Sequence, residues 1–415
     1  MERRNVYLDH AAATPLDPRV REAMLPYLDT RFHNPQSGHA RGYEVREALE
    51  AARAQVALLV GAPQRAIVFV SCGSEANNLA IKGVVAGWGG AKKRIVSSPI
   101  EHYSVLHPIK SLEKQGYPVT WVSVDAHGII TPEVLERAVW PDTGLVSIQT
   151  ANPEIGTVQD IAALASVVKE KAPEAVFHTD AVDAAGTIPV HVDELHVDLL
   201  SLAPSTFYGP KGTAALYVRP GVRLLPLIEG GVQEEGRRAG LENVPAIVGF
   251  GVAAALARQE MEQRTRHLLP LRDRLFAELP KRVEYLYLSG HPTRRLPGNV
   301  HCMVEFVEGE SLLLLLDDAG IAVSSGSACT SRALKASHVL QAVGADVAVA
   351  QGSLLFSLGA SNTMADVEYV LEALPPVVAK LRTLSPLWAY FQKTGARQQA
   401  GPGAYGDDHH TDGGA

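Results

Sequence analysis

The feature that most constrains this chain is a regular alternation of short β-rich runs with helical stretches. The β-rich runs are AIVFVS (66–71), RIVSS (94–98), VTWVSVD (119–125), LVSIQT (145–150), AVFHTD (175–180) and DLLSLA (198–203). Stretches with apolar residues at helical spacing, such as REALEAARAQVALLVG (46–61), lie between most of them. This alternation predicts an α/β fold with a mostly parallel sheet covered by helices.

The alternation ends near Gly251, where a long charged helix, AAALARQEMEQRTRHLLPLRDRLFAEL, is expected to begin. We therefore predict a large domain over 16–255 and a smaller α+β domain built from 1–15 and 256–397. The Gly-rich, polar segment 398–415 has little apolar surface to bury, so we expect a disordered tail there.

Composition excludes several classes of partner. The 415 residues carry a net charge of -7, which argues against binding to nucleic acid. No apolar stretch approaches the roughly 20 residues of a membrane span, and the first residues, MERRNVYLDHAAATP, lack the apolar region of a signal peptide. The three cysteines, Cys72, Cys302 and Cys329, fit a reducing cytoplasm better than a disulfide framework.

Ligands of a parallel sheet sit at the carboxyl ends of its strands, so the loops there are the first candidates for a site. The loop SCGSEANN (71–78) opens a helix with small residues. Free backbone N–H groups at Gly73 and Ser74 would suit a phosphate group. A capped helix start without a ligand is the alternative interpretation.

Two further loops place titratable side chains at strand ends. The segment PIEHYSVL brings Glu101 and His102 there, although a single histidine in such a place is often structural. The segment HTDAVDAAG ends a buried strand at Asp180. A carboxylate in that position suits the protonated ring nitrogen of pyridoxal phosphate (PLP).

Together and in this order, these loops resemble the cysteine desulfurase family, a class V aminotransferase branch of the fold type I PLP enzymes. The resemblance is carried, over about the first 395 residues, by VYLDHAAATPLDP, NPQSGHARG, EANNLAIKG, ANPEIGTVQDI, FHTDAVDAAG, FYGPKG, GLENVPAIVGFG, AVSSGSACTS and SPLWAYF. It implies a fold type I, aminotransferase-like protein that dimerises. It also implies PLP as the cofactor, with Gly73, Ser74, His102 and Asp180 at the cofactor-binding positions.

The stretch SLAPSTFYGPKG (201–212) departs from the family pattern at the residue that forms the Schiff base with PLP. Where the family has a Ser and then a His-Lys pair, this chain has Ala203, Ser205 and Thr206. A hydroxyl group cannot form an imine. Lys211 belongs to a Gly-Pro-Lys-Gly turn that the family has in addition, and the loop would need rebuilding for it to reach the aldehyde.

Five other positions depart from the same pattern. Pro153 replaces an Asn that bonds the pyridine hydroxyl, Asp183 replaces a donor Gln, and Cys72 replaces a glycine of the phosphate cup. Leu241 replaces a Thr that reaches the phosphate of the neighbouring subunit, and Leu355 replaces the Arg that clamps the substrate carboxylate. These changes predict that PLP is not held as a working internal aldimine.

The Ser/Gly-rich segment AVSSGSACTSRA carries Cys329, which the resemblance implies as the persulfide-forming nucleophile. The alternative is a cysteine that is merely tolerated among small residues. We expect Cys302 and Cys72 to be buried or structural.

The segment LRTLSPLWAYFQKTG (381–395) resembles the family's tail, which docks an iron–sulfur scaffold protein. An amphipathic helix packed on its own domain is the alternative. If docking is kept, Cys329 could ligate iron of a shared iron–sulfur cluster, since thiolates suit such clusters.

Three hypotheses remain open. The first is a cytoplasmic, PLP-deficient pseudoenzyme of iron–sulfur cluster assembly, in which Cys329 carries persulfide or ligates iron for a scaffold protein. The second is an active PLP-dependent cysteine desulfurase that uses Lys211 or binds PLP without an aldimine. The third is a non-catalytic partner that dimerises with an active paralogue. The first is favoured, and its dimer would be a homodimer or a heterodimer with that paralogue.

Overall fold

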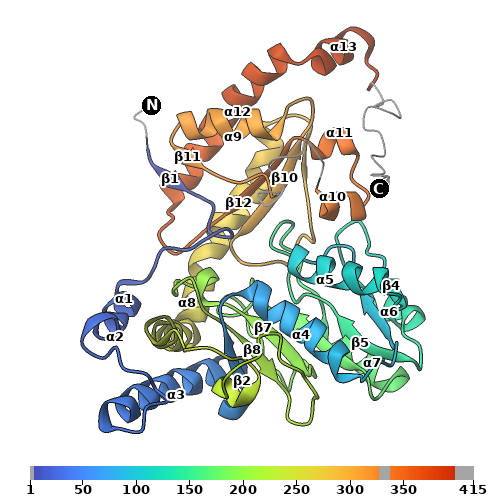
Figure 1. The fold of residues 1–415 in the computed structure, drawn as a ribbon. Coiled ribbons are helices and arrows are strands. Elements are labelled where there is room, and N and C mark those ends of the chain that lie inside the picture. The colour runs from blue at the N-terminus through green and yellow to red at the C-terminus, as the bar shows by residue number, and fades with distance from the viewer. Residues whose placement is uncertain (1–3, 327–336, 398–415) are drawn as a thin grey trace, which may run out of the picture.

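The computed structural model describes residues 4–326 and 337–397, and it is dominated by a seven-stranded sheet in the order β2-β8-β7-β6-β5-β3-β4 (Figure 1). The strands are β2 (Ile67–Val70), β3 (Arg94–Ser97), β4 (Val119–Trp121), β5 (Thr143–Ser147), β6 (Val176–Asp180), β7 (Leu199–Leu202) and β8 (Ala214–Val218). The neighbours from β7 to β4 pair in parallel, and β8 pairs antiparallel with β7 and with β2. The predicted α/β class with a mostly parallel sheet is confirmed.

Helices cover both faces of this sheet because its central strands are apolar on both sides. Ile95 and Leu145 face a core shared with α4 and α5, whereas their neighbours Val96 and Val146 face a core shared with α3, α6 and α7. The helices are α1 (Pro18–Met24), α2 (Pro26–Asp29), α3 (Ala40–Val60), α4 (Gly73–Gly87), α5 (Tyr103–Lys114), α6 (Pro132–Ala138) and α7 (Ile161–Lys171). Short 3-10 turns are η1 (Gln64–Ala66), η2 (Pro204–Thr206) and η3 (Gln233–Gly236).

A smaller α+β part lies above the large sheet in Figure 1 and has its own apolar core. Its antiparallel sheet has the order β12-β10-β9, and the N-terminal strand β1 pairs in parallel with β11. Its elements are β1 (Val6–Tyr7), β9 (Leu286–Leu288), β10 (Asn299–Val304), α9 (Gly309–Asp318), β11 (Ile321–Ala322), α10 (His338–Ala342), α11 (Val347–Ala350), β12 (Ser353–Ser357) and α12 (Met364–Leu384). The division at residues 15/16 and 255/256 stays a prediction.

The long helix α8 (Val244–Arg282) begins seven residues before the predicted start at Gly251. Asn243 caps it, since its side chain accepts from the N–H of Ala246 at 3.4 Å, and Pro245 lies in the first turn. Its first half packs in the core of the large sheet and its second half in the smaller core. One helix thus joins the two cores.

The last helix, α13 (Pro386–Thr394), packs on the smaller part through aromatic side chains. Trp388 and Phe391 lie with ring centroids 5.2 and 4.9 Å from that of Phe306. Leu387 and Tyr390 are exposed on the same helix. The predicted alternative, a helix that packs on its own domain, is therefore correct for its aromatic face. Across the ranges 4–326 and 337–397 no helix has the length and apolarity to cross a bilayer.

Candidate functional site

The parallel strands end at a cavity of about 480 Å³. Its walls come from the ends of β6 and β7, the starts of α4 and α5, and, from the smaller sheet, Leu355 of β12. The cavity brings together the predicted cofactor-binding residues Gly73, Ser74, His102 and Asp180. The predicted nucleophile, Cys329, lies outside the described residues.

Asp180 is held at the end of β6 by donors of the protein itself. Its Oδ2 accepts from Nδ2 of Asn77 at 2.6 Å, and its Oδ1 accepts from the N–H of Val182 at 3.0 Å. The side chain is nearly buried, and burial raises its pKa. Asn77, on α4, is a site residue that the sequence did not single out.

His102 caps α5 and is oriented by the next turn of that helix. Its Nδ1 accepts from the N–H of Ser104 at 3.1 Å, so the proton of the neutral ring is on Nε2. The Ser104 hydroxyl also accepts from Nδ2 of Asn77 at 2.8 Å. A continuous hydrogen-bonded chain therefore connects Asp180, Asn77, Ser104 and His102.

The start of α4 offers backbone donors to the cavity. The Cys72 side chain does not cap this helix, so N–H groups of the first turn remain open around Gly73 and Ser74. A side chain at position 73 would meet Val182 at 2.9 Å, which explains the glycine. Of the two expectations for Cys72, buried or structural, burial is wrong because the side chain is exposed and lines the cavity, and a structural role stays a prediction.

Thr206, which the sequence predicts at the Schiff-base position, lies in η2. Its hydroxyl donates to the carbonyl of Val182 at 2.7 Å. Lys211 is exposed and does not line the cavity. Among the residues that the structure describes, no primary amine lines the cavity.

Carboxyl groups are part of the polar lining of the cavity, together with hydroxyl groups, two asparagines and two histidines. The carboxyl groups belong to Asp9, Glu101, Glu154, Asp180 and Asp183, and neither Lys nor Arg is among the described residues that line it. Burial raises the pKa of Glu101 to about 8 and that of Glu154 to about 7. Burial and then the charge of Asp180 raise the pKa of Asp183 to about 8. These pKa shifts depend on burial in the folded protein, so they could not be predicted from the sequence.

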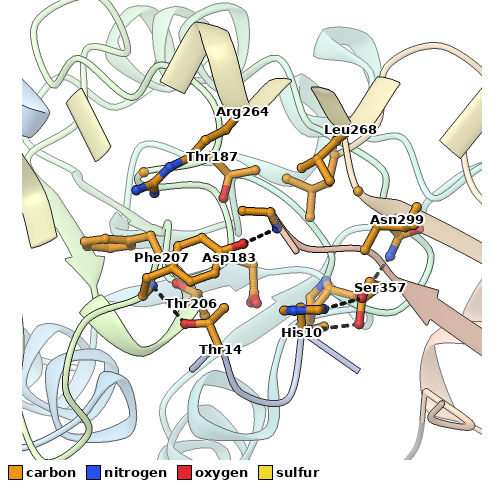
Figure 2. A pocket seen from close by; sticks show the side chains of 18 of the residues that line it. His10, Thr14, Asp183, Thr187, Thr206, Phe207, Arg264, Leu268, Asn299 and Ser357 are labelled. Atoms are coloured by element: carbon orange, nitrogen blue, oxygen red, sulfur yellow. Dashed lines mark hydrogen bonds between the residues drawn. The ribbon is translucent and has the colours of Figure 1, made fainter. Parts of the chain in front are cut away.

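A second cavity, of about 90 Å³, adjoins the first, and Asp183 and Thr206 line both (Figure 2). Thr14 closes it from below in Figure 2, where its hydroxyl accepts from the N–H of Tyr208 at 2.8 Å. Arg264 lies on the opposite side of this cavity and pairs with Glu260 at 2.8 Å.

Cys302 lies in β10 and is fully buried, as predicted. Burial raises the pKa of its thiol to about 12, so it is a structural side chain. Within the described part of the chain, no cluster of three or more His, Cys, Asp or Glu side chains could hold a metal ion.

The mostly parallel sheet has Asp180 and His102 at its strand ends, beside the N-terminus of α4. This arrangement is typical of a fold type I, aminotransferase-like protein. The family described as aminotransferase class-V matches residues 6–370. The chain is 47% identical over 384 residues to "Cysteine desulfurase IscS" of Dictyoglomus turgidum, covering 92% of this chain and 97% of that one. It is 48% identical over 386 residues to "Cysteine desulfurase IscS" of Methanosarcina thermophila, covering 93% and 95%.

Among solved structures, a "NifS-like protein" superposes with a TM-score of 0.86 at 36% identity, covering 91% of this chain and all of that one. The chain therefore belongs to the cysteine desulfurase family of class V aminotransferases. PLP is the cofactor of that fold type.

Proposed function

We propose that this chain is a cysteine desulfurase-family pseudoenzyme that forms no Schiff base with PLP and serves sulfur transfer in iron–sulfur cluster assembly. One observation supports the proposal: the hydroxyl of Thr206, the residue that the sequence pattern predicts at the Schiff-base position, is bonded to the carbonyl of Val182. An imine needs a primary amine, and Lys211 points to solvent instead of lining the cavity.

The cavity does not suit PLP in other respects. A phosphate group would find backbone N–H donors at α4 but no cationic side chain among the described lining residues. Asp183 places a carboxyl group where the family pattern has a donor, and Leu355 leaves no partner for a substrate carboxylate. We therefore route no chemical step through PLP.

Cys329 is the residue that we propose to carry sulfur. Its thiolate would attack the terminal sulfur of a persulfide on a donor protein, and the donor thiolate would leave, so the transfer needs no oxidant. Alternatively, the thiolate ligates iron in a cluster shared with a scaffold protein. Both roles rest on the sequence pattern around Cys329.

We propose that the protein works in the cytoplasm as a homodimer or as a heterodimer with an active paralogue. An iron–sulfur scaffold protein is the proposed partner of α13, whose exposed Leu387 and Tyr390 leave apolar surface for contact. The relatives named cysteine desulfurase IscS support this setting.

The second candidate is an active PLP-dependent cysteine desulfurase, which the near 50% identity to proteins of that name favours. Turnover assays separate the two candidates. The protein, incubated with PLP and L-cysteine, should form no alanine above the background of a Cys329→Ser variant. Alanine formation that Lys211→Ala abolishes would overturn the proposal.

The role of Cys329 needs its own test, which is cluster assembly on a scaffold protein with an added persulfide donor. Cys329→Ser should slow assembly, whereas Cys72→Ser should not. An unchanged rate with Cys329→Ser would contradict a chemical role and favour the non-catalytic dimer partner.

A further inference from the structure

We propose that the large cavity binds a small organic cation, with an ammonium or amidinium head and an apolar body. This inference rests on the proposed function, because a bound PLP would fill the same space. It names the class of ligand that the altered cavity takes in place of a phosphorylated cofactor.

Several carboxyl groups on the cavity lack partners. Asp9 and Asp183 line it half-buried; Oδ1 of Asp9 has no partner, and no hydrogen bond or ion pair joins the Asp183 side chain to a residue that the structure describes. Glu101 is fully buried; its Oε1 accepts from Ser98 at 2.6 Å, but its Oε2 has no partner. Unpaired buried carboxylates are costly, and a cation with N–H donors would supply both charge and hydrogen bonds.

Asn77 shows independently that the missing groups are donors. It is 1% exposed, its Nδ2 already donates to Asp180 and Ser104, and its Oδ1 has no partner. The cavity thus has spare acceptors at Asn77 and Glu101, while the amide donors are used. A ligand that complements these two acceptors must donate hydrogen bonds to them, while the open N–H groups at the start of α4 are separate donors of the same cavity.

Within the ranges 4–326 and 337–397, neither Lys nor Arg lines the cavity. Arg264 reaches only the smaller, adjoining cavity and forms its ion pair with Glu260. Two histidines line the cavity: His102 accepts at Nδ1 from its own helix, and Nε2 of His338 lies 3.0 Å from the carbonyl oxygen of Glu101. At pH 8.5, above the raised pKa values of Glu101, Glu154 and Asp183, the described lining is therefore net negative and suits a ligand of opposite charge.

The apolar lining defines the rest of the ligand. Ile100, Pro153, Val182 and Leu355 line the cavity beside the carboxyl groups. No described cationic side chain is present to pair with a ligand carboxylate. The ligand is thus an amine or amidine without a carboxylate, and not a free amino acid.

Isothermal titration with three probes of nearly equal shape tests the proposal at pH 8.5: benzamidine, neutral benzamide and anionic benzoate. Benzamidine should bind at least about tenfold more tightly than benzamide, and benzoate should not bind. Asp183→Asn should weaken benzamidine about tenfold, whereas Asp318→Asn, the same change on an exposed helix position, should not. Asp9→Asn serves if Asp183→Asn fails to fold.

The inference would be overturned if benzamidine did not bind, or if benzamide or benzoate bound as tightly as benzamidine. It would also be overturned if neither Asp183→Asn nor Asp9→Asn weakened the binding of benzamidine. The same preparations, treated with PLP and borohydride, keep it separate from the proposed function. A lysine-bound adduct would overturn both. No adduct together with no benzamidine binding would leave the proposed function standing and remove only the cation site.

Discussion

Two walls of the cavity differ in how they match the family pattern. The wall built on β6, α4 and α5 keeps Asp180 and His102, joined by hydrogen bonds through Asn77 and Ser104. Thr206 in η2 and Leu355 in β12 stand where the sequence pattern predicts cofactor attachment and substrate clamping. Because Asp180 is satisfied by the protein's own donors, the first wall holds its geometry without a ligand. Under the proposed function, the frame of the site persists although the groups that attach the cofactor are replaced.

The largest expected difference is in the alkylation rates of two cysteines, one that lines the cavity and one that is buried in the smaller sheet. Cys72 lines the cavity, whereas Cys302 is buried with its pKa raised to about 12. Iodoacetamide should alkylate Cys72 roughly 100-fold faster than Cys302 in the folded protein, as followed by peptide mass. In urea the two rates should converge; similar rates in the folded state would show that the wall is not open.

The stability of the wall that holds Asp180 and His102 should depend strongly on Asn77, because Asn77 forms hydrogen bonds to both Asp180 and Ser104. Asn77→Ala removes two hydrogen bonds and leaves buried Asp180 with one donor fewer, so the free energy of unfolding should fall by about 2–3 kcal/mol. Urea denaturation measures it. Asn78→Ala is the matched control, since Asn78 bonds mainly within its own helix and should cost less than about 1 kcal/mol. Equal losses would contradict a special role for Asn77.

In contrast to Asn77, substitution of Asp183 is expected to raise the free energy of unfolding. Its folded-state pKa is raised to about 8, whereas an unfolded Asp titrates near about 4, so the folded state holds an extra proton between these values. Stability therefore falls as the pH rises from about 4 to about 8. Asp183→Asn should flatten this fall and be more stable than the wild type by about 1–2 kcal/mol at pH 8, after a discount for its partial exposure.

Thermal and urea unfolding at pH 5 and pH 8 measure this difference. The other described charged or titratable groups that line the two cavities beside Asp183 stay in place in both proteins: Asp9, His10, Cys72, Glu101, His102, Tyr103, Glu154, Asp180, Tyr208, Arg264 and His338. The comparison of the two proteins therefore isolates Asp183. A variant whose pH profile parallels that of the wild type would show that Asp183 is already ionised.

Thr206→Val should have the smallest effect. It keeps the shape of the side chain and loses the hydroxyl that donates to the carbonyl of Val182, which should cost about 1 kcal/mol in urea denaturation. Thr187→Val is the control, because the Thr187 hydroxyl has no bond among the described residues. If both variants lose the same stability, the Thr206 hydroxyl is not fixed as the structure shows.

Much of the fold was accessible from the sequence. Short β-rich runs predicted strands such as β2, β3 and β6 within one or two residues, since buried parallel strands are continuously apolar. The convergence of Ser74, His102 and Asp180 on one cavity followed from the rule that ligands sit at strand carboxyl ends. The early start of α8 was missed although Asn243 and Pro245 gave a cap signal.

The hydrogen bonds and pKa shifts of the site could not be predicted from the sequence. Asn77 and Ser104 lie in ordinary helical sequence, and only the packing of α4 beside α5 shows that they connect Asp180 with His102. The raised pKa of Asp183 depends on burial beside Asp180, which a linear pattern does not contain. The exposure of Cys72 likewise depends on the cavity beside it.

The central claim is that no lysine of this protein forms a Schiff base with PLP. Its most direct test is borohydride reduction of the full-length protein after incubation with PLP and removal of the excess, followed by a spectrum and peptide mass mapping. A Thr206→Lys variant serves as the positive control for trapping. We expect no aldimine band and no specific pyridoxyl adduct in the wild type. A stoichiometric adduct on Lys211 would contradict it and identify an active-enzyme site.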